Sequence, residues 1–178
     1  MEKVARPLRI CLTGAESTGK SELAKELGVH FSAIVVPEYS REYALARGGE
    51  LSYTDVGPIA RGQVELEDRS AASGLVILDT DVLSTVVYSR HHFGACPEWV
   101  ELLARLRLAD RYLLLDIDVP WVRDPVRDSG DTRDSLQDDF HRALKEFGAK
   151  YTVISGQWDE RWRRAVEAIE AARAKLPS

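Results

Sequence analysis

The chain is organised around the stretch Gly14-Ala15-Glu16-Ser17-Thr18-Gly19-Lys20-Ser21. The stretch fits the pattern G-x-x-x-x-G-K-S/T, in which two glycines let the backbone curl so that its N–H groups point at phosphate oxygens. The apolar run 8–12 before it predicts a strand, and residues 22–28 after it predict a helix. The positive end of that helix faces the same anion. Strand, loop and helix together indicate a nucleotide-binding site rather than an ordinary glycine-rich turn.

Each position of the loop has an expected role in holding a nucleotide. We expect Lys20 to reach the β- and γ-phosphates and the Ser21 hydroxyl to ligate Mg²⁺. The rest of the predicted nucleotide-binding set is Gly14, Ala15, Glu16, Ser17, Thr18, Gly19 and Glu22.

Composition places the chain among ordinary soluble domains. Its 178 residues are enough for one domain, 1–178, with a sizeable core, and 44% of them are hydrophobic and 30% charged. A net charge of −5 argues against a general nucleic-acid binder. The first residues contain no apolar signal-peptide stretch, and no apolar run approaches the length of a membrane span. We therefore expect a cytoplasmic protein with no membrane or nucleic-acid partner. The oligomeric state is not predicted.

Strand and helix patterns alternate along the chain. Predicted strands cover 8–12, 33–36, 75–78, 112–115 and 151–154, and predicted helices cover 22–28, 40–47, 55–72, 81–90, 97–108, 132–147 and 158–176. Thr54 and Thr132 are expected to cap the helices that follow them. Five apolar strands separated by helices predict an α/β domain with a five-stranded parallel sheet covered on both faces.

Acidic residues follow three of the predicted strands. Glu38 follows the second strand, Asp79 and Asp81 follow the third, and Asp116 and Asp118 follow the fourth. Because ligands of such sheets bind at the carboxyl ends of the strands, we expect these carboxylates beside the phosphate loop.

Specific roles are expected for the carboxylates after the second and third strands. Asp79 has the form of the carboxylate that orients Mg²⁺ or its water, the alternative being a helix cap, for which Asp81 is the better candidate. Glu38 is positioned to accept the proton of an attacking hydroxyl, the alternative being a solvated turn residue. Arg41 follows Glu38 within one turn, so both side chains can face one cleft.

A mobile lid is expected at about residues 121–133, an irregular segment rich in Arg and Asp. Phosphoryl transfer needs cations that close over the phosphates, and Arg127 and Arg133 are the predicted catalytic lid cations. The alternative is a solvated loop whose Asp residues cancel the charge. The histidines are interpreted as surface or helix-end residues, and Trp158 and Trp162 of the last helix as core residues.

Four stretches together resemble the ribosylnicotinamide kinase domain of the NadR family. They are the phosphate loop, Val36-Pro37-Glu38-Tyr39-Ser40-Arg41-Glu42, Leu78-Asp79-Thr80-Asp81 and Asp118-Val119-Pro120-Trp121-Val122-Arg123-Asp124-Pro125-Val126-Arg127. The loop is shared by many families, whereas the second and fourth stretches are much more specific. The resemblance covers nearly the whole chain in the right order.

This resemblance implies a three-layer P-loop kinase-like α/β domain that uses ATP and Mg²⁺. The implied reaction is phosphorylation of the 5′-hydroxyl of nicotinamide riboside, which gives nicotinamide mononucleotide. Family members often carry an adenylyltransferase domain, and some a DNA-binding domain, for which this chain has no room. We therefore expect neither adenylyl transfer nor transcriptional regulation.

The chemistry of nicotinamide riboside indicates which residues would bind it. The cationic ring needs an aromatic face or a carboxylate, for which Tyr39, Trp121 and Asp124 are expected. The ribose needs hydrogen-bonding groups, for which Arg41 and Asp81 are expected. Two alternatives stay open, a kinase for another nucleoside or nucleotide and a non-catalytic nucleotide-binding regulatory module. The sequence contains no Asn-Lys-x-Asp motif of the kind that guanine-nucleotide switches use to read the base.

Overall fold

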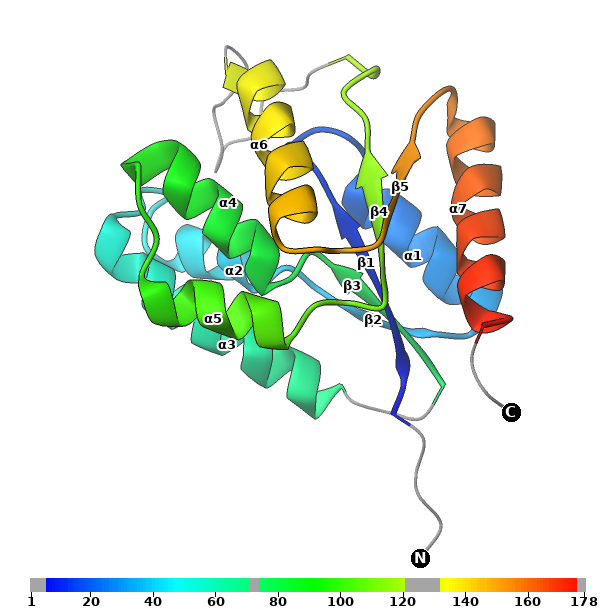
Figure 1. The fold of residues 1–178 in the computed structure, drawn as a ribbon, viewed down its shortest axis with the longest axis horizontal. Coiled ribbons are helices and arrows are strands. Elements are labelled where there is room, and N and C mark those ends of the chain that lie inside the picture. The colour runs from blue at the N-terminus through cyan, green and yellow to red at the C-terminus, as the bar shows by residue number, and fades with distance from the viewer. Residues whose placement is uncertain (1–5, 71–73, 121–131, 176–178) are drawn as a thin grey trace, which may run out of the picture.

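The computed structural model describes residues 6–70, 74–120 and 132–175. Within them, a five-stranded sheet lies at the centre of the molecule, in the order β2-β3-β1-β4-β5 (Figure 1). Every pair of neighbouring strands is parallel, which confirms the predicted sheet. The strands are β1 Leu8–Thr13, β2 Ile34–Val36, β3 Leu75–Asp79, β4 Arg111–Leu115 and β5 Tyr151–Ile154.

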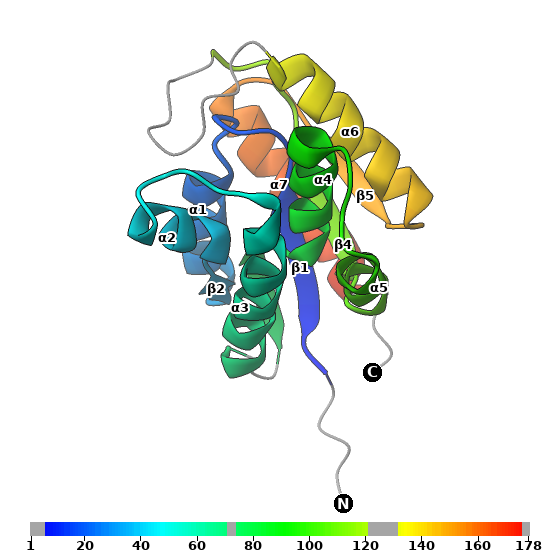
Figure 2. The ribbon, with the colours of Figure 1, turned by 90° about the vertical axis from the view of Figure 1, so that its left-hand side faces the viewer.

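Helices cover both faces of the sheet, which gives three layers (Figure 2). One face packs against α1 Lys20–Phe31 and α7 Trp158–Arg173. The other face packs against α3 Val56–Arg69, α4 Val82–Phe93, α5 Glu98–Leu106 and α6 Arg133–Glu146, while α2 Tyr39–Ala46 lies beside α3. No helix in the described part of the chain is both long and apolar enough to cross a membrane.

The central residues of strand β1, 10–12, are all apolar, because both faces of the sheet are covered there. Ile10 and Leu12 belong to the core on the α1 and α7 side, and Cys11 belongs to the core on the opposite side. All three side chains have 0% exposure. A strand covered on both faces has no solvent side, so it reads as a continuous apolar run rather than an alternating one.

The start of α3 corrects one predicted cap. A short 3-10 helix, η1 Tyr53–Asp55, precedes α3, and Thr54 lies inside it. Ser52 is the residue that caps η1, because its N–H donates to Asp55 Oδ2 at 2.8 Å while its own side chain completes a capping box. Ser52 and Thr54 are chemically similar and two positions apart, so the sequence pattern favoured the wrong one.

The parallel strands place all their carboxyl ends at one edge of the sheet. The arrows of β4 and β5 point to this edge, which lies at the top of Figure 1. The loop from β1 to α1 and the segments that follow β2, β3 and β4 therefore meet there, as ligand-binding loops do in sheets of this type.

Candidate functional site

The phosphate loop joins β1 to α1 and contains three residues with positive φ, Gly14 at 127°, Ser17 at 55° and Gly19 at 87°. A Cβ added at Gly14 would lie 2.7 Å from the carbonyl oxygen of Leu115, and one at Gly19 would lie 2.9 Å from the ring of Trp158. Glycine is therefore required at both positions by conformation and by space. Ser17 adopts the left-handed region without being glycine, so the loop stores backbone strain there.

Lys20 and Ser21 begin α1 directly after the loop. The Lys20 amine donates to the carbonyl oxygens of Gly14 at 3.0 Å and Ala15 at 2.6 Å, so it lies folded across the loop. The Ser21 hydroxyl donates to Asp79 Oδ2 at 2.6 Å, and Asp79 is the last residue of β3 with 7% exposure. The structure thus brings together the two predicted Mg²⁺ ligands.

A cavity of about 170 Å³ opens in front of the loop, and we call it the phosphate cavity. It is lined by Glu16, Ser17, Thr18, Gly19, Lys20, Ser21, Glu22, Glu38 and Arg41. All nine belong to the predicted nucleotide or substrate sets. The described residues contain no cluster of three or more His, Cys, Asp or Glu that could hold a metal by itself. A hydroxyl and one carboxylate instead fit Mg²⁺, which takes few protein ligands and completes its shell with phosphate oxygens and water.

A larger cavity, of about 330 Å³, lies beside the phosphate cavity. This is the lower end of the volume range of small-molecule sites, and it suits a molecule of nucleoside size. Its wall combines apolar and aromatic side chains from α3 and α4 with two carboxylates, Glu38 and Asp81. It also contains many hydroxyl-bearing residues, which are Ser40, Ser52, Thr80, Ser84, Thr85, Tyr88 and Ser89.

Glu38 lines both cavities, and no other residue in the described ranges does so. It stands immediately before α2, and its Oε1 accepts a hydrogen bond from the Ser40 hydroxyl at 2.6 Å. The next residue, Tyr39, is held through its backbone N–H, which donates to Gln63 Oε1 at 3.0 Å. Gln63 belongs to α3 and is 2% exposed, so the segment that carries Glu38 is anchored to a buried side chain.

A buried chain of polar contacts fixes the orientation of Gln63. Its Nε2 donates to Glu67 Oε1 at 3.4 Å, and Glu67 Oε2 accepts from Arg9 at 2.6 Å and Arg107 at 3.2 Å. Burial raises the pKa of Glu67, and the two arginines act against this rise. Because the nitrogen end of the amide faces a carboxylate, the oxygen end is left to accept from Tyr39.

Thr80 separates two carboxylates into two different sites. It has a φ of 69°, an uncommon value for a β-branched residue, and it stands between Asp79 at the phosphate loop and Asp81 at the larger cavity. Asp81 caps α4 as expected, because its Oδ1 accepts from the N–H of Leu83 at 3.1 Å. Its Oδ2 accepts from the Tyr112 hydroxyl at 2.6 Å, and burial raises the pKa of Asp81. Asp81 therefore reaches the cavity wall with both oxygens already bonded.

Two predicted substrate residues lie away from the larger cavity. Tyr39 does not line it, because its ring packs on Gly62 of α3 and leaves no room there for a Cβ. Arg41 lines the phosphate cavity instead. The position of the Tyr39 ring depends on Gly62, which has no side chain and lies on a different helix. The sequence around Tyr39 therefore could not indicate this position.

Arg133, predicted as a lid cation, occupies a different position. It begins α6 with 7% exposure, and it donates to the carbonyl oxygens of Val119 at 2.9 Å and Ser17 at 3.0 Å. Burial lowers its pKa. Its guanidinium is thus bound to the backbone of the phosphate loop and does not line the phosphate cavity. The remaining predicted lid and substrate residues, Trp121, Asp124 and Arg127, lie outside the described residues.

A second buried arginine, Arg161 of α7, was not predicted. Its side chain has 0% exposure and donates to the carbonyl oxygens of Gly156 at 2.9 Å, Thr18 at 3.0 Å and Asp116 at 2.9 Å, and it forms an ion pair with Asp118. Arginine side chains on amphipathic helices are usually exposed to solvent. The helical pattern around Arg161 therefore did not predict that it is buried.

The aromatic wall of the larger cavity was also missed. Tyr88 and His92 stand one turn apart on α4, with ring centroids 5.9 Å apart and planes inclined by 19°, and both line the cavity. The Tyr88 hydroxyl donates to Glu16 Oε2 at 3.1 Å, which links this wall to the phosphate loop. His92 is an exposed residue of the last turn of α4, as interpreted from the sequence, but its place in the cavity wall was not predicted. The i, i+4 spacing of two aromatic rings was the available signal.

The two tryptophans of α7 have different surroundings. Trp162 packs against the core as expected. Trp158 does not, because it is 37% exposed, its ring contacts Gly19, and its Nε1 donates to Glu26 Oε2 at 3.3 Å. One of the two predicted core residues is thus part of the surroundings of the phosphate loop.

A family model described as AAA domain matches residues 9–161 of the chain. The trifunctional NAD biosynthesis/regulator protein NadR of Salmonella typhimurium is 29% identical over 170 residues, which are 90% of this chain and 42% of that protein. The chain therefore spans less than half the length of this curated relative.

Solved structures show the same likeness. NadR protein in complex with NAD and AMP-PNP and NadR protein in complex with NR align with TM-scores of 0.75 and 0.76. Both are 25% identical to this chain, and each alignment covers 96% of this chain and 50% of the other. A thymidylate kinase from Ehrlichia chaffeensis, 15% identical, aligns with a TM-score of 0.69 over 93% of this chain and 99% of its own. These findings confirm the predicted P-loop α/β fold and the resemblance to NadR proteins.

Proposed function

The chain belongs to the AAA domain family, and from this premise we propose that it phosphorylates the 5′-hydroxyl of nicotinamide riboside with ATP, giving nicotinamide mononucleotide. Its likeness to NadR proteins supports the broader statement, a nucleoside kinase-like role in NAD metabolism. An ATP-dependent kinase also fits the cytoplasmic location expected from the sequence.

The observation that carries the proposal is the position of Glu38 between the two cavities. A kinase must bring an acceptor hydroxyl to the γ-phosphate in line with the bond that breaks. With the nucleotide phosphates in one cavity and the nucleoside in the other, the reacting groups meet beside the Glu38 carboxylate. There it would orient the 5′-hydroxyl and take its proton.

The phosphate cavity supplies the groups that a triphosphate needs. The N–H groups of the loop and the amino-terminal end of α1 attract phosphate oxygens, and Lys20 would add a positive charge at the β- and γ-phosphates. Ser21 and Asp79 are the residues that would hold Mg²⁺. When bound, Mg²⁺ neutralises the charge of the phosphate oxygens during transfer. AMP-PNP, an ATP analogue, is bound in a structure of NadR protein, which supports ATP as the donor.

The larger cavity supports a cationic nucleoside as acceptor. The aromatic residues Tyr88 and His92 line it, and Glu38 and Asp81 add acidic side chains. An aromatic face attracts a cation by about 0.5–2 kcal/mol, and the carboxylates disfavour an acceptor that is already phosphorylated. A structure of NadR protein in complex with NR supports the same acceptor class.

The test is a screen of acceptors at fixed ATP and Mg²⁺, with product masses measured. We expect ATP consumption to rise on addition of nicotinamide riboside, and kcat/KM to be higher for it than for adenosine or uridine. Removal of Mg²⁺ with a chelator should abolish turnover. A preference for a neutral nucleoside would support kinase activity but contradict nicotinamide riboside as the substrate. Slow ATP hydrolysis that no acceptor stimulates would instead support a regulatory module.

A further inference from the structure

Two arginines from different helices bind consecutive carbonyl groups of the phosphate loop. Arg133 of α6 donates to the Ser17 oxygen, and Arg161 of α7 donates to the Thr18 oxygen, each at 3.0 Å. Both side chains are buried, with exposures of 7% and 0%. The two residues lie 116 and 143 positions along the chain from the carbonyls that they bind.

These carbonyls are where such a loop needs support. When successive N–H groups turn toward a phosphate, the carbonyls of the same peptides turn outward, and in a buried setting each requires a donor. Ser17 also holds a φ of 55°, which persists only when its surroundings enforce it. Arg133 fixes the carbonyl of this strained residue, and Arg161 fixes the next one.

The same guanidinium groups also bind the segment that follows β4. Arg133 donates to the carbonyl of Val119 at 2.9 Å, and Arg161 donates to the carbonyl of Asp116 at 2.9 Å and pairs with Asp118. Each arginine thus joins the phosphate loop to the end of β4. Arginine suits this task because its planar fork presents several N–H groups in fixed directions, whereas lysine is a compact point charge.

We propose that Arg133 and Arg161 are paired positioning residues, which hold the Ser17 and Thr18 carbonyls outward and thereby keep the phosphate loop ready for the nucleotide. Neither arginine lines the phosphate cavity. The inference rests on the proposed function for the identity of the nucleotide, but its test measures binding to the loop and needs no acceptor.

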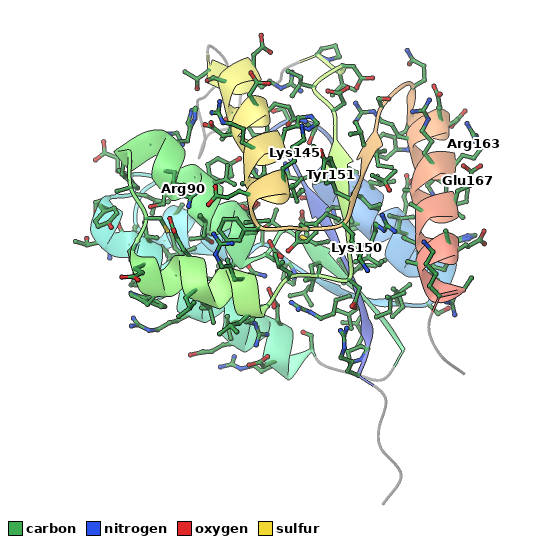
Figure 3. All side chains as sticks on the ribbon, viewed as in Figure 1. Arg90, Lys145, Lys150, Tyr151, Arg163 and Glu167 are labelled. Carbon is green, nitrogen blue, oxygen red and sulfur yellow. The ribbon has the colours of Figure 1, made fainter. Side chains whose placement is uncertain are left out.

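The test substitutes Arg161→Lys and, separately, Arg133→Lys, which keep the charge and shorten the reach. Arg163→Lys is the matched control, because Arg163 points outward from α7 and pairs with exposed Glu167 at 2.7 Å (Figure 3). Calorimetry gives the affinities for Mg²⁺·AMP-PNP, for inorganic pyrophosphate and for nicotinamide riboside. Circular dichroism and urea unfolding establish that each variant is folded under the assay conditions. Hydrogen exchange then reports on the amides of residues 14–21.

We expect each lysine variant to bind AMP-PNP and pyrophosphate about tenfold more weakly, by a similar factor for both ligands, because the shared phosphate loop is affected. Binding of nicotinamide riboside should change less than twofold, and amides 14–21 should exchange faster while the core strands do not. The control should match the wild type.

A folded variant of either arginine with unchanged affinity would overturn the proposal, as would uniformly faster exchange throughout the protein. If Arg161→Lys does not fold, Arg133→Lys decides the question by itself. If the wild type binds AMP-PNP but phosphorylates no nucleoside, the proposed kinase activity is contradicted, whereas the role of the two arginines can still be tested by binding. A wild type that binds neither AMP-PNP nor pyrophosphate contradicts both proposals.

Discussion

The two neighbouring cavities are built in different ways. Residues 16–22, seven in a row, make up most of the wall of the phosphate cavity. The wall of the larger cavity comes from several separate stretches between residues 38 and 93, which packing brings together. A site made from one backbone segment is decided by local sequence. A site assembled from several elements is decided by tertiary packing, so its residues are harder to recognise before the fold is known.

Removing the central cation of the phosphate cavity should have the largest effect. We expect Lys20→Ala to lower kcat/KM for ATP by about 10³-fold, because the positive charge that stabilises the phosphates during transfer is lost. Binding of the nucleoside should stay within twofold, since Lys20 does not line the larger cavity. Lys25→Ala on the exposed side of α1 is the control. Steady-state kinetics and calorimetry check both, and a folded Lys20→Ala with normal turnover would remove the assigned site.

At the boundary of the two cavities, Glu38→Gln should lower kcat by about 10²-fold while the KM values for ATP and nucleoside change little. In a loose transition state the carboxylate mainly orients the hydroxyl, so the loss belongs to turnover rather than binding. Glu42→Gln, an exposed residue of α2, the helix that Glu38 precedes, is the control. Rapid-mixing measurement of the transfer step separates chemistry from product release. A rise in KM with unchanged kcat would make Glu38 a binding residue only.

In the larger cavity, Tyr88→Leu should raise KM for nicotinamide riboside by about tenfold and leave KM for ATP unchanged. The loss corresponds to one aromatic contact with a cation, within the range of about 0.5–2 kcal/mol. Tyr88→Phe keeps the ring and removes only the hydroxyl that binds Glu16, so it should recover most of the affinity. Equal effects of both substitutions would assign the role to the hydroxyl instead.

The smallest expected effect is that of Asp118 on the free energy of unfolding at acidic pH. Burial acts against ionisation of Asp118, but the Gly156 N–H and the Arg161 guanidinium together hold its pKa below the ordinary 3.8. A lowered folded-state pKa contributes stability that is present above 3.8 and is lost as pH falls through the folded value. The free energy of unfolding should therefore fall more steeply below about pH 4 in the wild type than in Asp118→Asn.

Urea unfolding between pH 3 and 7 measures this difference. Asp138→Asn, an exposed residue of α6, is the control and should follow the wild type. Parallel curves for Asp118→Asn and the wild type would show that the ion pair with Arg161 contributes nothing to stability. Because Asp118 does not line the larger cavity, affinity there should stay the same in both variants.

Features that depend on short stretches of sequence were predicted correctly. The phosphate loop, the five strands and the carboxylates Glu38, Asp79 and Asp81 near strand ends all follow from short patterns. The structure places Asp79 against Ser21 of the loop, Glu38 at both cavities and Asp81 at the larger one. Tyr39 was assigned to substrate because it neighbours Glu38 in the chain, but its ring is directed by Gly62 of another helix. A position next to Glu38 in the sequence did not predict which cavity the Tyr39 side chain would line, because neighbouring side chains can point in different directions.

Two residues that sequence reasoning missed, Arg161 and Tyr88, bind partners far along the chain. Arg161 meets Thr18 across 143 residues, and Tyr88 meets Glu16 across 72. Periodicity predicts that such residues lie on a helix and indicates which face they occupy. It does not indicate which loop that face will contact. Polar contacts between elements far apart in the sequence therefore cannot be predicted before the fold is known.

The burial of Arg161 has a consequence for the order in which the protein forms. A ribosome adds about 5–20 residues per second, so Arg161 is made roughly 7–30 s after the Thr18 carbonyl that it holds. During that interval the nascent chain contains the whole of the Gly14–Ser21 stretch without its anchor in α7. A contact of such long sequence separation must also overcome the entropy of closing a long loop before it stabilises the loop. The segment that most clearly identifies this protein is thus synthesised early and completed late.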